Sequence, residues 1–109
     1  MIWDLIFLPE ADDDFNSLDR RQKIIVDNAI KKVQTNPLPQ SEGGYGKPLG
    51  HKKGRNLTGF FKIKLKGEGI RIVYRLIKIK TKMLVVVIGL REDEEVYEIA
   101  AKRMKKYNL

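Results

Sequence analysis

The stretch FFKIKLKGEGIRIVYRL, residues Phe60–Leu76, decides the fold because charged and apolar residues alternate on both sides of a short glycine turn. Five cations recur at even spacing along its two halves: Lys62, Lys64, Lys66, Arg71 and Arg75. Matching apolar residues across the hairpin requires an even-length connection, either Gly67-Glu68 as a two-residue turn or a four-residue turn. Both registers place the cations on one face. Like charges opposed across a sheet are destabilising, so we expect this face to meet a negatively charged partner.

Working outward toward the C-terminus, two further elements follow the predicted strands Phe60–Lys66 and Ile70–Ile77. The run Lys82–Leu90 is apolar at nearly every position, which is typical of a central strand covered on both faces. Apolar residues at helical spacing predict a last helix over Asp93–Tyr107. Tyr97 lies one residue off that apolar stripe, so we expect its ring at the margin of the helix rather than inside the core.

Toward the N-terminus, Ile2–Leu8 reads as a strand ended by a proline, and a short helix is expected to follow. A longer helix is predicted over Arg20–Thr35, with Asp19 as its N-cap. Residues 37–59 are rich in glycine, proline and lysine and predict a surface loop. The order strand–helix–helix–strand–strand–strand–helix predicts an α+β fold. We expect one domain over residues 1–109, with a largely antiparallel sheet, helices packed on one face, and the basic surface on part of the other.

The amino-acid composition limits which covalent and metal sites the protein can form. The chain has 109 residues, no cysteine and a single histidine, His51, which excludes disulfides and thiolate sites and argues against zinc or iron. We therefore expect no metal and no cofactor. The N-terminus lacks the basic segment of a signal peptide, and the apolar runs are too short to span a bilayer. A cytoplasmic location, away from membranes, is the expectation.

The charges are segregated along the chain. The net charge is +8, with six acids and no base between Asp4 and Asp19, but twelve bases and one acid between Lys47 and Lys82. Such segregation is the electrostatic pattern of a protein that meets a polyanion, and nucleic acid is the leading candidate.

Three segments resemble the RelE branch of the RelE/ParE toxin superfamily, and the resemblance extends over nearly the whole chain. They are GKPLG at 46–50, FKIKLKGEGIRIVYR at 61–75 and VVVIGLREDEEVY at 85–97. In that branch, two lysines on a strand, the arginine of the next strand, an arginine after the last strand and a nearby tyrosine form an mRNA-cleaving site. The matching positions here are Lys62, Lys64, Arg71, Arg91 and Tyr97. Leu90 and the longer loop before the hairpin depart from the pattern, so the resemblance implies the chemistry of the family more strongly than its fine substrate preference.

The resemblance implies a role for each of these residues in cleavage by the ribose 2′-hydroxyl. Lys62 would be the base, and Lys64 with Arg71 would stabilise the charge of the transition state. Arg91 would act at the leaving oxygen. Tyr97 would stack on or orient a base. His51 lies in a glycine-flanked loop with no evident neighbour to fix its tautomer, and it is not among the expected catalytic residues.

The resemblance also implies partners. The chain would be the toxin of a type II toxin–antitoxin pair, cutting mRNA in the ribosomal A site without a metal and neutralised by a cognate antitoxin. Further bases would contact RNA: Lys47, Lys52, Lys53, Arg55 and Lys66. Two alternatives remain open at this point. One is a ParE-like gyrase inhibitor without catalysis, and the other is a basic RNA-binding module without chemistry.

Overall fold

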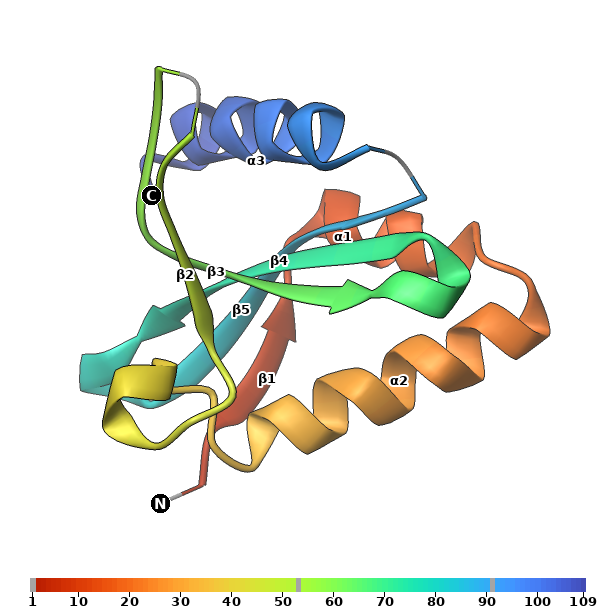
Figure 1. Ribbon diagram of the computed structural model, residues 1–109, viewed down its shortest axis with the longest axis horizontal. Coiled ribbons are helices and arrows are strands. Elements are labelled where there is room, and N and C mark those ends of the chain that lie inside the picture. The colour runs from red at the N-terminus through yellow and green to blue at the C-terminus, as the bar shows by residue number, and fades with distance from the viewer. Residues whose placement is uncertain (1, 53, 91) are drawn as a thin grey trace.

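A five-stranded mixed sheet organises the protein (Figure 1). The computed structural model describes residues 2–52, 54–90 and 92–109. In chain order the elements are β1 (Asp4–Phe7), α1 (Pro9–Asn16), α2 (Arg20–Gln34), β2 (Lys47–Lys52), β3 (Arg55–Leu65), β4 (Ile70–Ile77), β5 (Lys82–Gly89) and α3 (Asp93–Tyr107). The strand order is β1-β5-β4-β3-β2, with β1 parallel to β5 and every other neighbouring pair antiparallel. The predicted α+β fold with a largely antiparallel sheet is confirmed.

The hairpin of β3 and β4 has the predicted parity. Leu65 lies opposite Ile70 and Lys64 opposite Arg71, so the lysines of β3 and the arginines of β4 leave the same face of the sheet. The connection is the four-residue alternative, residues 66–69, and Lys66 therefore belongs to the turn rather than to the strand. Gly69 ends this turn with a φ of 65°, a left-handed conformation that glycine adopts without strain.

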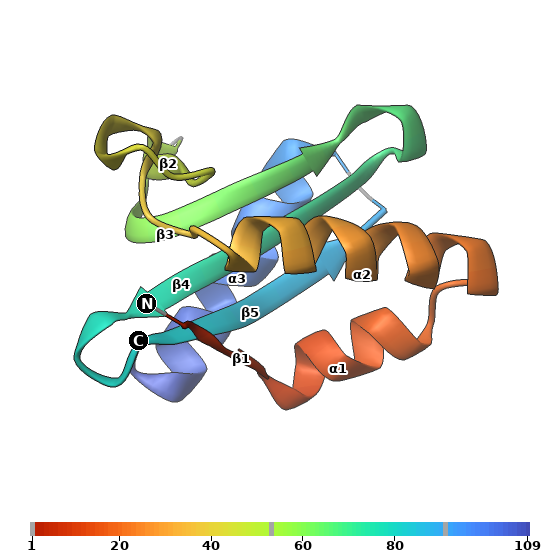
Figure 2. The same ribbon diagram turned by 90° about the horizontal axis from the view of Figure 1, so that it is seen from below.

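The helices cover both faces of the sheet, which corrects the expectation that they pack on one. Figures 1 and 2 place α1 and α2 on one side of the sheet and α3 on the other. The reason lies in β5, where Met83–Ile88 are all buried, so apolar side chains on both faces require a cover. The basic face of the hairpin is consequently the face on which α3 lies.

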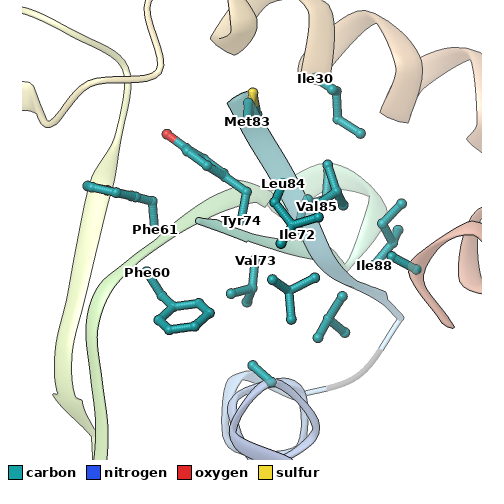
Figure 3. Packing of buried hydrophobic residues seen from close by; sticks show 14 of the residues in the cluster. Ile30, Phe60, Phe61, Ile72, Val73, Tyr74, Met83, Leu84, Val85 and Ile88 are labelled. Carbon is teal, nitrogen blue, oxygen red and sulfur yellow. The ribbon is translucent and has the colours of Figure 1, made fainter. Parts of the chain in front are cut away.

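The core follows the same division. Phe60 and Val73 point toward α3, whereas Ile72 and Tyr74 point to the opposite face, where Ile30 of α2 lies (Figure 3). The Tyr74 ring stacks on Phe61, with ring centroids 5.3 Å apart. Burial raises the pKa of the Tyr74 hydroxyl, which donates a hydrogen bond to the Pro37 carbonyl at 3.0 Å. This bond fastens the segment after α2 to the sheet.

Residues 37–59 were predicted as a surface loop, and this is wrong for their second half. They contain β2 and the first part of β3, which pair antiparallel at the sheet edge. The signals of a strand are weak here because Pro48 and Gly50 interrupt the pattern, and the pairing shifts register between them. An edge strand tolerates proline, since one row of its backbone groups needs no partner strand. Burial of Leu49 and Leu57 holds the pair in place.

Helix boundaries agree closely with the sequence. Asp19 caps α2 through a reciprocal capping box with Gln22, as the N-cap prediction requires. The predicted helix Arg20–Thr35 ends one residue earlier in the structure, and α3 has the predicted bounds. Within the described residues, no helix has both the length and the apolar character that crossing a membrane demands.

Candidate functional site

The basic face of the hairpin forms one wall of an open cavity of about 550 Å³, and the start of α3 forms the facing wall. The lining residues are Arg55, Lys62, Lys64, Arg71, Glu92, Asp93, Glu94 and Tyr97. Four of the five residues predicted for the catalytic site therefore come together around one space. The fifth, Arg91, lies outside the described residues.

Side-chain parity on two paired strands explains how the cations converge. Lys62 and Lys64 leave the same face of β3, and Arg71 leaves that face of β4 directly opposite Lys64. The side chains of Lys64 and Arg71 are 28% and 18% exposed, so both are partly shielded from solvent. Arg71 is further fixed by a hydrogen bond from its Nη1 to the Gly69 carbonyl at 3.1 Å.

Asp93, the first residue of α3, lies among these cations and was not predicted as part of the site. Its carboxylate accepts hydrogen bonds from Arg71 Nε and from Lys64 Nζ, the latter at 3.3 Å. Burial acts to raise the pKa of Asp93, but the hydrogen bonds and positive charges of Arg71 and Lys64 outweigh it. The pKa of Asp93 is therefore below its ordinary value, and the group is a carboxylate at neutral pH. The negative charge of Asp93 thus reduces the repulsion expected between Lys64 and Arg71.

Tyr97 was expected at the margin of its helix, and the structure corrects this. Tyr97 is 5% exposed, because the sheet against which α3 packs covers the flank of the helix as well as its apolar stripe. The hydroxyl is buried and has no hydrogen-bond partner among the described residues. Burial raises the pKa of Tyr97, the Asp93 charge raises it further, and Arg71 acts to lower it. An unpaired buried hydroxyl beside a cavity is the feature that a bound ligand would satisfy.

Four of the five residues predicted to contact RNA lie in the described part of the chain, and two of these line cavities. Arg55 lines the cavity, 3.7 Å from Glu98, and Lys47 lines a neighbouring cavity of about 240 Å³ between α2 and the hairpin. Lys66 lies exposed in the turn, and Lys52 ends β2. Lys53 lies outside the described residues.

His51 lies exposed on β2 and is not among the residues that line the main cavity. In the described part of the chain, no group of three or more His, Cys, Asp or Glu side chains is arranged to hold a metal ion. The chemistry available in the cavity is that of clustered cations and a tyrosine, with acidic side chains beside them. Such a set binds an anion and stabilises negative charge that develops on it.

Comparison with known proteins supports the resemblance drawn from the sequence. No family model matches the chain. A RelE-like toxin protein of Escherichia coli is 29% identical over 106 residues, which cover 96% of this chain and the whole of that protein. The mRNA interferase toxin RelE of Escherichia coli K12 is 42% identical over 50 residues, 46% of this chain and 53% of that toxin.

Solved structures share the fold over almost the full length. A double mutant of the Escherichia coli toxin RelE in the free state superimposes with a TM-score of 0.74 at 27% identity, covering 95% of this chain and 99% of that one. The same mutant toxin in complex with a peptide of the antitoxin RelBc gives a TM-score of 0.68 at 25% identity, covering 92% and 95%. Taken with the shared order of elements, these likenesses show that the chain is similar to RelE toxins in both sequence and fold.

Proposed function

We propose that this protein is the toxin of a type II toxin–antitoxin pair, and that it is an endoribonuclease that cleaves mRNA held in the ribosomal A site. One observation carries the proposal. Lys62, Lys64, Arg71 and Tyr97 line a single cavity, in which the Tyr97 hydroxyl is buried without a partner among the described residues. Residues with the types that RelE-like toxins use are thereby gathered from three elements.

Cleavage without a metal requires a base for the ribose 2′-hydroxyl, donors for the charge on phosphorus, and a group at the leaving oxygen. We assign Lys62 as the base. Arg71 and Lys64 would hold the phosphate, Arg71 by the paired contacts for which a guanidinium is suited. Attack by the 2′-hydroxyl would leave a 2′,3′-cyclic phosphate and a 5′-hydroxyl. The role of Arg91 at the leaving oxygen rests on the family resemblance alone.

Dependence on the ribosome follows from how poor the cavity is in acid–base groups that titrate near neutral pH. Holding a substrate in reactive geometry can supply roughly 7–11 kcal/mol toward a reaction barrier. A ribosome that positions the message would provide this contribution. The exposed bases around the cavity would then meet ribosomal RNA, and binding would weaken with salt.

An antitoxin is the second proposed partner. A RelE relative has been solved with an antitoxin peptide, and this chain carries a net charge of +8 with its bases concentrated on the hairpin. We propose that an acidic or amphipathic antitoxin segment neutralises the protein by covering the basic face or displacing the last helix.

The experiment is primer extension on an mRNA in a reconstituted translation reaction, with and without ribosomes. Wild-type protein should cut inside A-site codons only when ribosomes are present. Arg71→Ala should reduce the rate about 10²–10³-fold, the loss typical of a donor that stabilises transition-state charge. Arg75→Ala is the matched control, since Arg75 lies on the same strand and face but contacts the Phe60 ring, 5.4 Å away, instead of the cavity.

Equal activity of Arg71→Ala and Arg75→Ala would refute the assigned site. Absence of cuts in both conditions, from protein with a wild-type circular dichroism spectrum, would refute the nuclease. The gyrase inhibitor and the RNA-binding module would then be tested by supercoiling and by RNA-binding assays.

A further inference from the structure

Asp93 occupies the place that the proposed function gives to the substrate phosphate. Its two carboxylate oxygens are each taken by one of the cations assigned to that phosphate, Oδ1 by Arg71 Nε and Oδ2 by Lys64 Nζ. Carboxylate and phosphate present similar oxygen pairs to a guanidinium. The protein therefore holds an internal anion on its own anion-binding groups.

This internal anion is held firmly in its charged form. Arg71 and Lys64 keep the pKa of Asp93 below its ordinary range against the opposing effect of burial. Asp93 also lies in the first turn of α3, where the helix dipole favours negative charge. Its competition with another anion thus persists at neutral pH.

We propose that Asp93 is a specificity-determining residue, an internal competitor that a substrate phosphodiester must displace from Lys64 and Arg71 before the RNA is held. The inference rests on the proposed function. Free RNA is bound only through exposed contacts. The free-energy cost of displacing Asp93 is then not offset by other contacts, and free RNA binds weakly. RNA that a ribosome positions in the cavity makes additional contacts, which allow its phosphate to replace Asp93 on Lys64 and Arg71. Asp93 would thereby restrict the protein to messages that are already positioned.

A purely structural Asp93 makes the opposite prediction. If the carboxylate served to aim Lys64 and Arg71 at the RNA, its removal would leave two long side chains less ordered and would weaken RNA binding. The two roles therefore differ in the sign of the effect of Asp93→Asn, which keeps the size and shape of the side chain and removes its charge.

The test is fluorescence anisotropy with the full chain and a labelled oligoribonucleotide that carries 2′-O-methyl groups throughout and so cannot be cleaved. Asp93→Asn should lower Kd about threefold to tenfold, the range expected for losing two partly exposed ion pairs. The plot of log K against log salt concentration should steepen by about 0.7, since one further phosphate contact becomes available. Asp93→Glu should restore binding close to the wild type.

Glu95→Gln is the matched control for net charge. Glu95 lies in the same first turn of α3, but it does not line the cavity. Its Kd should stay within about twofold of the wild type, the difference expected of a screened surface charge. An equal effect of Glu95→Gln and Asp93→Asn would overturn the proposal, because net charge alone would then explain it.

Unchanged or weaker binding by Asp93→Asn would overturn the proposal, and so would a failure of every variant to bind the oligonucleotide. Because the probe cannot be cut and no ribosome is present, this result is independent of the primer-extension assay. A protein that shows the Asp93 effect but no cleavage on ribosomes would refute the proposed function alone.

Discussion

The Tyr97 hydroxyl is buried without a hydrogen-bond partner among the described residues, and leaving a buried donor unpaired costs about 1–3 kcal/mol. Tyr74, whose side chain lies on the opposite face of the sheet (Figure 3), is the counterpart, since its buried hydroxyl donates to the Pro37 carbonyl. The Tyr97 hydroxyl is therefore available to hydrogen-bond a ligand, whereas the Tyr74 hydroxyl already forms a hydrogen bond within the fold.

Tyr97→Phe should therefore leave the free energy of unfolding unchanged or raise it by up to about 1 kcal/mol, because it removes an unsatisfied polar atom. It should lower mRNA cleavage about tenfold to a hundredfold, since a hydrogen bond to a charged ligand is worth roughly 1.5–3 kcal/mol and about 1.4 kcal/mol is a factor of ten. Urea denaturation and the primer-extension assay measure the two effects.

Tyr74→Phe is the control and should behave in the opposite way. It should destabilise the protein by about 1–3 kcal/mol, because the buried Pro37 carbonyl loses its donor. Its cleavage rate at a temperature where the variant is folded should remain that of the wild type. A loss of stability in Tyr97→Phe as large as in Tyr74→Phe would mean that the Tyr97 hydroxyl already has a partner in the free protein.

At the scale of elements, the sequence predicts best where one local pattern is strong. The capping residue Asp19 and the helical spacing of apolar residues locate α2, and alternation locates β3 and β4 in the correct relative register. The edge pair of β2 and β3 could not be predicted in this way. Pro48, Gly50 and the register shift remove the alternation, and the pairing depends on contacts distant in the chain.

The candidate site shows the same limit. Lys62, Lys64 and Arg71 follow from strand parity, because one face of a hairpin is fixed by alternation alone. Asp93 and the burial of Tyr97 depend on which face of the sheet α3 covers, and an apolar stripe indicates that a helix is buried without indicating against what. The sequence signal for Asp93 was the acidic run at the start of α3. This run follows directly after β5, the strand that pairs with β4.

The capping box of α2 gives a prediction at this scale. Asp19→Ala should lower the free energy of unfolding by about 1 kcal/mol, because the hydrogen bond that the Asp19 carboxylate accepts from the Gln22 backbone N–H is lost. Asp19→Ser retains a cap and should recover most of that stability. Thermal or urea unfolding measures both. If Asp19→Ser were as unstable as Asp19→Ala, the capping hydrogen bond would not be the cause.

At the scale of the whole molecule, the acids of α1 and the bases of α3 join the two ends of the chain. Asp14 accepts from Arg103 at 2.7 Å and from the Ile88 backbone at 3.1 Å, and Arg103 also donates to the Val86 carbonyl. Nearby, Glu10 accepts from Lys106 and from the hydroxyl of Tyr107. Two acids of the N-terminal segment are therefore paired in space with bases of α3, which lie outside the basic segment Lys47–Lys82.

The Glu10 contacts make part of the stability dependent on pH. Hydrogen bonds from Lys106, and then from Tyr107, lower the pKa of Glu10 from 4.5 to about 2. A carboxyl whose pKa is depressed by folding contributes stability above its unfolded pKa and loses it as pH falls through its folded pKa. The unfolding free energies of wild type and Glu10→Gln should therefore differ by a constant amount above about pH 5. Between about pH 4.5 and pH 2 the difference should decline, and it should vanish below that.

Equilibrium urea unfolding at a series of pH values, from about 2 to 8, measures this difference. Lys106→Met should show the same decline toward acid, since it removes the hydrogen bond that lowers the Glu10 pKa most, and its effect should be smaller when Glu10→Gln is already present. A double-mutant cycle at neutral pH isolates that coupling. A gap between wild type and Glu10→Gln that stayed constant down to pH 2 would exclude an ionised Glu10 as its source, because the protonated carboxyl no longer attracts Lys106.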